Sequence, residues 1–185
     1  AELDRLYSTS GGRLFVAGSG ASLFFASAGG TAFTSPAGPL AFSTLVQNAN
    51  GTFTLTSKTG ETETFGSNGL LTARTDLNGN AVTYAYVDAN SDGQATELST
   101  VTDPFGRVTT CNYTAGKVSS VVDFAGRSTT LTRDGASRIT AVTSPDPDGA
   151  GPLSAPVTSL GYDSANRLTS VTDPDRKSTR LNSSH

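Results

Sequence analysis

Short apolar runs separated by glycine, proline and small polar residues predict strands rather than helices along the whole chain. In the N-terminal part these runs are Leu14-Phe15-Val16, Leu23-Phe24-Phe25 and Leu40-Ala41-Phe42. Between residues 52 and 56 apolar and polar residues alternate strictly, which places Phe53 and Leu55 on one face and threonines on the other. We therefore expect many short strands and no helix.

Turn-forming dipeptides separate several of these runs. They are Asn50-Gly51, Asn68-Gly69 and Asp134-Gly135. Asn-Gly and Asp-Gly favour the tight turns that match the twist of paired strands, so each dipeptide predicts a hairpin. Residues 14–57 include no charged side chain, and we expect their strands to be paired on both edges within a larger sheet.

A degenerate unit recurs along the chain, and its fullest copy runs from Tyr162 to Pro174. The copies align on one valine and on an aspartate two residues later. A fixed internal period is typical of repeat proteins, in which each unit depends on its neighbours for a core. The aligned valines are Val101, Val121, Val142 and Val171, which step by 20, 21 and 29 residues, and an earlier copy has Arg74 at this position.

The aspartate of three copies is followed, three residues later, by a glycine. An aspartate side chain can accept hydrogen bonds from the backbone downstream of it, and glycine tolerates a positive φ. Each copy therefore predicts a strand that ends in a turn. The residues concerned are Asp76 and Gly79, then Asp103, Gly106 and Arg107, then Asp123, Gly126 and Arg127, and in the last copy Asp173.

The two recurring apolar positions of a copy are three residues apart, as Leu168 and Val171 are. Side chains three apart in a regular strand point to opposite faces of the sheet. Either both faces are partly covered, or a bulge intervenes between the two positions. The sequence leaves both alternatives open.

This unit resembles the repeats of the Rhs family, which are also called YD repeats after the Tyr-Asp pair that stands here as Tyr162-Asp163. Residues 51–56 and 64–72 are similar to the less regular lead-in repeats of that family. In the unit that ends at Val142, Leu131-Thr132 occupies the place expected for the tyrosine. On this resemblance we expect a β-rich lead-in region at 1–46 and Rhs/YD-type repeats at 47–174.

The resemblance implies an all-β fold, in which repetitive short antiparallel strands and hairpins coil into a curved sheet. In the family such sheets form a hollow shell around the C-terminal part of the same polypeptide, often a toxin. The implied role is a non-catalytic structural segment, whose partner is the C-terminal cargo of its own parent chain. The implied location is secreted or at the cell surface of a bacterium.

A cell-surface module for adhesion or carbohydrate binding is the competing class. Aromatic side chains can stack on sugars, and the tyrosines at the unit starts are Tyr84, Tyr86, Tyr113 and Tyr162. Their periodic placement favours packing across neighbouring strands instead. Carbohydrate therefore stays the alternative partner.

The last eleven residues, 175–185, resemble the translation of a common sequencing adapter, a string found at the ends of metagenomic proteins. We exclude them from the interpretation of the fold, as one would a cloning scar. The chain is accordingly interpreted as an internal fragment of a longer protein.

Composition narrows the classes of function. The net charge is −3 and no cluster of lysine and arginine is interleaved with aromatic residues, so nucleic acid is not an expected partner. No apolar run is long enough to cross a bilayer, so no membrane insertion is expected.

Candidates for catalysis and for cofactors are few. The only histidine, His185, lies in the adapter-like segment, so no histidine base stands beside a nucleophile and no enzyme activity or cofactor is expected. The only cysteine, Cys111, can form no internal disulfide. It lies within a strand-like run, where a free cysteine usually acts as a small buried apolar residue.

One loop has a pattern related to calcium sites. Asp88, Asn90 and Asp92 have the oxygen spacing at which calcium loops begin. Ser99 stands where the closing bidentate carboxylate would be required, and Glu97 comes two residues too early. The interpretation that we favour is a solvated turn, with calcium as the alternative.

Overall fold

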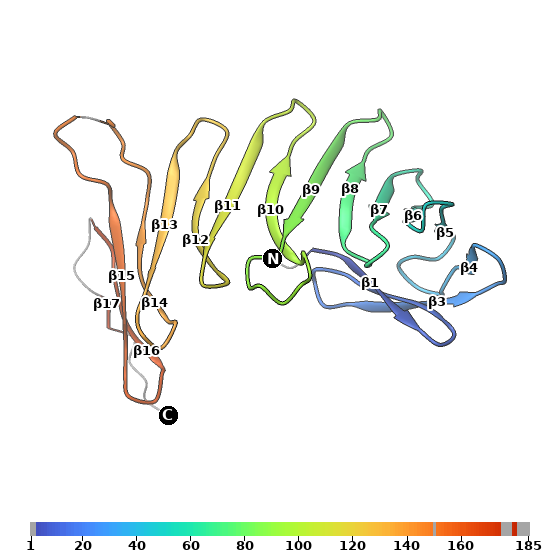
Figure 1. Cartoon of the computed structure of the whole chain (residues 1–185), viewed down its shortest axis with the longest axis horizontal. Helices are drawn as coiled ribbons and strands as arrows, with labels where there is room; N and C mark the ends of the chain where they lie inside the picture. Colours follow the sequence, from blue (N-terminus) through green and yellow to red (C-terminus); the bar gives the residue numbers. More distant parts are fainter. Residues whose placement is uncertain (1–2, 150, 175–178, 181–185) are drawn as a thin grey trace. The chain divides into compact units, whose positions relative to one another are not determined.

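The computed structural model describes residues 3–149, 151–174 and 179–180 (Figure 1). These residues are all-β and include no helix, as the sequence predicts. The strands are β1 (Arg5–Thr9), β2 (Gly12–Val16), β3 (Ser22–Ser27), β4 (Ala32–Thr34), β5 (Thr44–Gln47), β6 (Phe53–Thr56), β7 (Thr62–Phe65), β8 (Leu71–Thr75), β9 (Ala81–Val87), β10 (Glu97–Thr102), β11 (Val108–Thr114), β12 (Lys117–Val122), β13 (Ser128–Arg133), β14 (Ile139–Thr143), β15 (Val157–Tyr162), β16 (Leu168–Thr172) and β17 (Thr179–Arg180).

The chain divides into two compact units. Unit 1 comprises Ala1–Tyr86 and Thr100–Arg107, and unit 2 comprises Val87–Ser99 and Val108–His185. In both units strands that follow one another in the chain pair antiparallel. The predicted adapter-derived segment lies outside the described residues except for β17, which pairs with β16.

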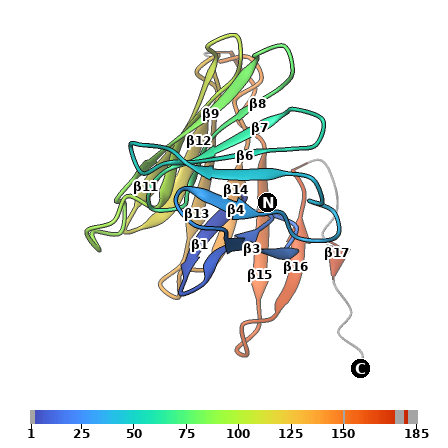
Figure 2. The ribbon, with the colours of Figure 1, turned by 90° about the vertical axis from the view of Figure 1, so that its right-hand side faces the viewer.

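In unit 1 the strands from β1 to β9 form one antiparallel series (Figure 2). The expectation for residues 14–57 is confirmed, because each strand of this charge-free stretch pairs on both of its edges. Backbone pairing therefore continues without a free edge through the least polar part of the sequence.

The strand predicted at Leu40-Ala41-Phe42 was wrong. These residues form a turn, in which the Ala41 amide donates to Gly38 and the Ser43 amide donates to Leu40. Pro36 and Pro39 lie just before it, and proline has no N–H to donate to a ladder. The strand β5 begins only at Thr44, and Phe42 is 84% exposed with a φ of 68°.

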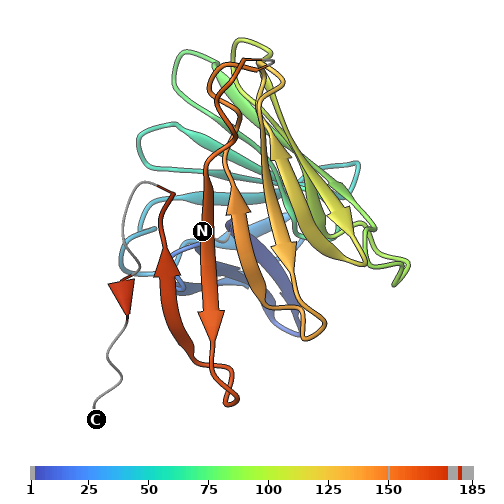
Figure 3. The same ribbon diagram turned by 90° about the vertical axis from the view of Figure 1, so that its left-hand side faces the viewer.

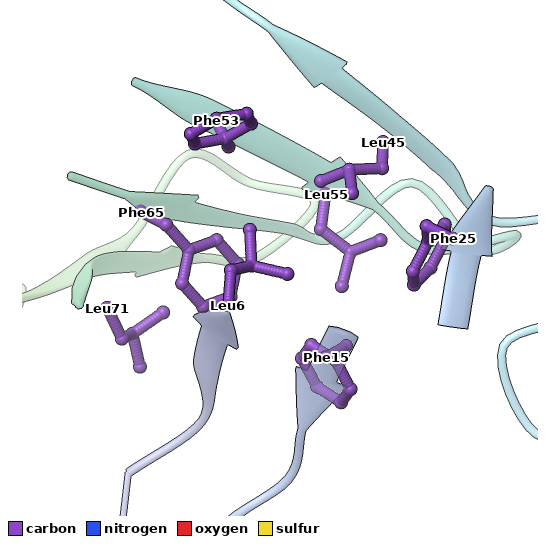
Figure 4. Packing of buried hydrophobic residues seen from close by; sticks show 8 residues of the cluster. All are labelled: Leu6, Phe15, Phe25, Leu45, Phe53, Leu55, Phe65 and Leu71. Atoms are coloured by element: carbon purple, nitrogen blue, oxygen red, sulfur yellow. The ribbon is translucent and has the colours of Figure 1, made fainter. Parts of the chain in front are cut away.

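The core of unit 1 lies between its first strands and the strands that follow (Figure 4). The side chains of Phe15 and Phe65 meet edge to face, with ring centroids 6.3 Å apart. Burial of one such side chain contributes about 1.5–3 kcal/mol, so this unit has a core of its own. The buried cluster is Leu6, Phe15, Phe25, Leu45, Phe53, Leu55, Phe65 and Leu71.

Unit 2 is a run of hairpins from β11 to β16, which lie side by side (Figure 3). None of its described side chains is fully buried. Apolar residues within its strands, such as Leu131 and Val142, are half-buried and lie opposite each other on neighbouring strands, whereas Phe124 and Leu153 in the connections are exposed. The two units therefore share a way of pairing strands and differ in how deeply they bury side chains.

One five-residue turn connects most of the hairpins. The amide of its first residue donates to the carbonyl of the fifth, and the amide of the fourth donates to the carbonyl of the first. The fourth residue has a positive φ, as in hairpin loops that end in a left-handed residue. In the described residues the turn begins at Ala17, Asn48, Ser57, Gly66, Asp76, Asp103, Asp123, Asp134 and Asp163.

The hairpins predicted at Asn50-Gly51 and Asn68-Gly69 are confirmed as β5–β6 and β7–β8, with each glycine in the left-handed position. A hairpin also follows β13, but Asp134-Gly135 only begins its turn. The left-handed residue there is Ser137, with a φ of 65°. The hairpin predicted at this dipeptide is therefore confirmed.

A β-bulge lies between the two apolar positions that are three residues apart in each copy. In the β15–β16 pair Gly161 lies opposite Ser170 and Tyr162 lies opposite Leu168, so Thr169 is an extra residue. Because one residue is extra, Leu168 and Val171 point to the same face of the sheet. The same bulge occurs in β7–β8, β11–β12 and β13–β14, where the extra residues are Thr72, Ser119 and Thr140.

The bulges give each hairpin of unit 2 one apolar face and one polar face. Residues opposite each other on the apolar face include Cys111 and Val121, Leu131 and Val142, and Leu160 and Val171. The other face carries mainly serine, threonine and asparagine, which are more exposed. Of the two alternatives left open by the sequence, the structure therefore shows the bulge.

Substitution of Gly69 can test how much the close approach of β1 to this turn contributes to stability. The Leu6 amide of β1 donates to the Gly69 carbonyl at 2.9 Å, and a Cβ on Gly69 would lie 1.8 Å from the Leu6 carbonyl oxygen. Gly79 has a similar φ, 82° against 78°, but nothing within 4 Å of its Cβ position.

We expect Gly79→Ala to cost about 1–2 kcal/mol, the cost of a left-handed alanine, and Gly69→Ala to cost clearly more because β1 must move. Urea unfolding followed by circular dichroism measures both changes. Equal midpoints for the two variants would show that the approach of β1 to this turn is not needed for stability.

Candidate functional site

The aspartates that mark the repeat hold the five-residue turns closed. In the turn at Asp163 one carboxylate oxygen accepts from the amides of Ala165 and Arg167, both at 2.9 Å. The other oxygen accepts from the Arg167 guanidinium at 2.8 Å. The same three bonds recur at Asp103 with Arg107, at Asp123 with Arg127 and at Asp134 with Arg138.

The predicted turn residues occupy these positions. Asp76 makes the same backbone bonds, with Asn80 in place of the arginine. Gly79, Gly106 and Gly126 are the left-handed fourth residues, with φ of 82°, 78° and 79°. Asp173 is exposed directly after β16, and residues 175–177, into which its turn would run, lie outside the described residues.

The place of the missing tyrosine in the unit that ends at Val142 needs a correction. The residue that immediately precedes the turn aspartate, as Tyr162 precedes Asp163, is Arg133 and not Leu131-Thr132. Arg133 lies opposite Ile139 just as Tyr162 lies opposite Leu168. The Asp-x-x-x-Arg spacing of this turn was present in the sequence and would have given the right alignment.

Three of the tyrosines join a strand to the strand before it. The hydroxyl of Tyr86 donates to the Leu71 carbonyl at 2.7 Å, that of Tyr113 donates to Leu98 at 2.7 Å, and that of Tyr162 donates to Ile139 at 2.9 Å. All three side chains are half-buried. The structure therefore places these rings in packing between hairpins, as the periodic spacing favours.

Arg138 links two neighbouring turns of unit 2. Its guanidinium pairs with Asp134 at 2.7 Å and donates to the Asn166 side chain at 2.9 Å. It also lies 4.9 Å from the centre of the Tyr162 ring, where a cation is attracted to the aromatic face. The Tyr-Asp pair of one hairpin is thus held by the turn of the preceding hairpin.

The turn carboxylates are poor candidates for acid or base chemistry. The Arg127 side chain lowers the pKa of Asp123, the Arg138 side chain lowers that of Asp134, and the Arg167 amide lowers that of Asp163. A carboxylate that is already fully bonded and easily ionised does not accept a proton near neutral pH. These residues support the hairpins.

A different cluster, Asp4, Glu63 and Arg74, is the main group of interacting charges in unit 1. The Arg74 guanidinium donates to Asp4 at 2.5 Å and to Glu63 at 2.9 Å. Asp4 also accepts from the Gly18 amide at 2.6 Å. The cluster therefore joins the segment before β1, the turn after β2, and the strands β7 and β8.

The two carboxyl groups of this cluster differ in their affinity for protons. Burial and the neighbouring Asp4 raise the pKa of Glu63 to about 7, although Arg74 acts in the opposite direction. Burial also acts to raise the pKa of Asp4, but the Gly18 amide, Glu63 and Arg74 outweigh it and lower the pKa. A single proton near neutral pH therefore lies on Glu63.

Glu63 and Arg74 stand where the later hairpins carry apolar pairs. They lie opposite each other across β7–β8, just as Leu160 and Val171 do across β15–β16. In the sequence Arg74 stands out only as a departure from the repeat, and nothing there pointed to Asp4 or Glu63. The charge at a position that is otherwise apolar was the one signal of the cluster.

The loop after β9 shows why its calcium pattern is incomplete. Asp88 accepts from the Asp92 and Gly93 amides at 3.0 and 2.8 Å, so its oxygens serve the loop itself. The Asn90 side-chain amide donates to both Asp92 and Glu97, and its NH2 group stands between their carboxylates. Among the described residues no group of three or more acidic, histidine or cysteine side chains is arranged to hold a metal ion.

Cys111 lies in the middle of β11, as expected, but it is half-buried rather than buried. Burial raises the pKa of its thiol. The protonated thiol is a weak nucleophile, so the residue serves packing against Val121.

Comparisons with known proteins do not assign this chain to a family. No protein-family model matches the chain, and no curated protein matches it. No helix in the described part of the chain could span a membrane.

The pKa of Glu63 predicts an unusual pH dependence of stability. Its folded value, about 7, lies above the ordinary 4.5, so the folded state binds this proton more tightly than the unfolded state does. The stabilisation is complete below about pH 4.5 and is lost as the pH rises through about 7. We expect the free energy of unfolding to fall by roughly 1–3 kcal/mol between pH 5 and 8, reduced from the full shift because the site is partly solvated.

Urea unfolding across this pH range measures the effect. Glu63→Gln should remove most of the slope, whereas Glu61→Gln, an exposed neighbour in the same unit, should keep it. Aspartates with lowered pKa lose their contribution only at lower pH, outside this window. A wild-type slope that survives in Glu63→Gln would show that another group is responsible.

Calcium should not stabilise the protein. A ligand that binds only the folded state raises stability by mass action, and the Asp88 loop uses its oxygens for its own amides. We expect the melting temperature to be unchanged in millimolar calcium. A rise of several degrees that disappears in Asp92→Ala would contradict this and would restore calcium as a ligand.

Proposed function

We propose that this chain is a non-catalytic structural repeat segment of an Rhs/YD-repeat protein. Its hairpins form part of the wall of a shell that encloses a C-terminal toxin domain of the same longer polypeptide. The observation that carries the proposal is one bulged hairpin, repeated in β7–β8, β11–β12, β13–β14 and β15–β16. A parent protein that exports such a toxin would be secreted or at the cell surface.

The distribution of apolar side chains supports a wall. The hairpins of unit 2 have an apolar face and a polar face, and none of their described side chains is fully buried. Repeats of this kind gain stability from their neighbours rather than from a core of their own. An apolar face that the unit leaves half-exposed suits the interior of a larger enclosure.

The bonding of polar groups supports a structural role. The repeated aspartates are bonded to their own turns, and three of the tyrosine hydroxyls are bonded to backbone carbonyls. A wall works by exclusion, so it requires strand pairing and no convergent set of reactive groups. A sugar site should instead gather free aromatic faces and hydrogen-bonding side chains at one place.

The test begins with the uninterrupted gene from the same DNA. We expect the reading frame to continue into a compact, unrelated C-terminal domain. In limited proteolysis of the full-length protein this domain should resist digestion, because the wall excludes the protease. The same domain expressed alone is the control and should be digested.

Two results would favour the adhesion module instead. One is a parent chain that ends in a wall anchor or a transmembrane segment without such a domain. The other is glycan binding by this chain that is lost in Tyr162→Ala and kept in Tyr162→Phe, because phenylalanine preserves the ring for stacking and removes only the bond to Ile139.

A further inference from the structure

Three Asn-Gly dipeptides occupy the same place in three five-residue turns of unit 1. Each asparagine is the third residue of its turn, and each glycine is the fourth. The asparagines are Asn50, Asn68 and Asn78, in the turns that begin at Asn48, Gly66 and Asp76. Asparagine is thermolabile, because the backbone nitrogen of the next residue can attack its side-chain carbonyl, and glycine hinders this attack least since it has no Cβ. The three dipeptides therefore share one intrinsic chemistry and differ only in their surroundings.

Two of the three asparagine side chains help to close their own turns. The Asn50 Oδ1 atom accepts from the Thr52 hydroxyl at 2.7 Å and from the Thr52 amide at 3.2 Å. The Asn68 Oδ1 atom accepts from the Leu70 amide at 3.2 Å. Attack requires the side-chain carbonyl to be aligned with the amide of the next residue. A carbonyl that is held on the residue after that must first break its bond.

The Asn78 side chain has no such bond, because Asp76 closes this turn. The Asp76 carboxylate accepts from the backbone amides of Asn78 and Asn80, at 2.8 and 2.9 Å, and from the Asn80 side chain at 2.8 Å. Within the part of the chain that the structure describes, the Asn78 side chain takes part in no hydrogen bond. It is exposed and free to rotate.

The attacking nitrogens differ in their access to solvent. Gly69 is buried, and its carbonyl accepts from the Leu6 amide of β1 at 2.9 Å. Gly51 is half-buried, whereas Gly79 is exposed and has nothing within 4 Å of its Cβ position. Solvent must take the proton of the glycine amide before the attack, and the turn must open locally for this. Only at Asn78-Gly79 are both reacting groups accessible.

We propose that Asn78 is a site of spontaneous deamidation and isoaspartate formation, selected by the turn in which it lies. Hydroxide removes the proton of the Gly79 amide, and the nitrogen attacks the Cγ atom of Asn78. The N–Cγ bond forms and the Cγ–Nδ2 bond breaks, while the side-chain nitrogen takes a proton from water and leaves as ammonia. A water molecule then opens the cyclic imide at either carbonyl, which gives aspartate or isoaspartate.

Isoaspartate changes the turn itself. The main chain then runs through Cβ and Cγ of residue 78 and is longer by one carbon atom. The turn is closed by the Asp76 amide, which donates to the Asn80 carbonyl at 3.0 Å, and by the Gly79 amide, which donates to the Asp76 carbonyl at 3.1 Å. An extra atom between these groups displaces them, and the turn fixes the register of its hairpin. The modification therefore weakens the β8–β9 hairpin.

The test follows all three asparagines in one sample of the full chain, incubated at pH 8. Mass spectrometry of its peptides measures the loss of each side-chain amide, and an isoaspartate methyltransferase labels the isoaspartate. We expect Asn78 to react roughly tenfold faster than Asn50 or Asn68, a factor that corresponds to about 1.4 kcal/mol in the barrier. In concentrated urea the three should react at similar rates, because the turns that distinguish them are absent.

A matched pair of variants tests the cause without changing any reacting residue. The hydroxyls of Thr52 and Thr54 both accept from the Asn48 side chain, at 2.9 and 3.1 Å, but only that of Thr52 bonds Asn50. We expect Thr52→Val to speed the reaction of Asn50, whereas the control Thr54→Val should not.

Four results would overturn the proposal. They are equal rates at the three asparagines of the folded chain, no reaction at Asn78, a preference for Asn78 that persists in urea, and an Asn50 rate that the two threonine variants change equally. None of them bears on the proposed wall, which depends on the pairing of the hairpins.

Discussion

The left-handed residue at the fourth position of each five-residue turn is the constraint on which both units depend. In a hairpin the turn fixes the register, and a slip by one residue moves every side chain to the other face. In β6 such a slip would turn Phe53 and Leu55 out of the core. Glycine meets the constraint most cheaply, and in two turns of unit 2 Ser137 and Asn166 meet it with the support of an aspartate and an arginine.

Local patterns in the sequence were sufficient to predict most of the strands and most of the turns. The alternation around Phe53 and the Asp-x-x-Gly spacing each concern contacts within a few residues, where propensity and turn chemistry decide the outcome. The bulge was not decidable, because a spacing of three between Leu168 and Val171 has two solutions and only the partner strand selects one. The error at Leu40-Ala41-Phe42 has a related cause. The run has the composition of a strand, but Pro36 and Pro39 just before it have no N–H to donate to a partner strand.

The cluster of Asp4, Glu63 and Arg74 illustrates what a single sequence cannot supply. Asp4 and Arg74 are 70 residues apart, and they meet because the hairpin of β1 and β2 returns across the turn at Gly69. No period or motif connects them. Only the fact that a repeat position changes from valine to arginine pointed to this place, and it gave no indication of the partner.

The exchange of an apolar pair for charges fits the different surroundings of the two units. In unit 2 the pair Leu160 and Val171 lies on a half-buried face, where contact between the side chains is what the hairpin gains. In unit 1 the first strands cover part of the equivalent position, and a partly buried ion pair there stabilises less than an apolar pair would, because both charges lose part of their water. Its advantage is geometric. Arg74 can bond Asp4 only when the segment before β1 is in place, and Asp4 in turn bonds the Gly18 amide. The charged pair thus helps to fix where the covering strands lie.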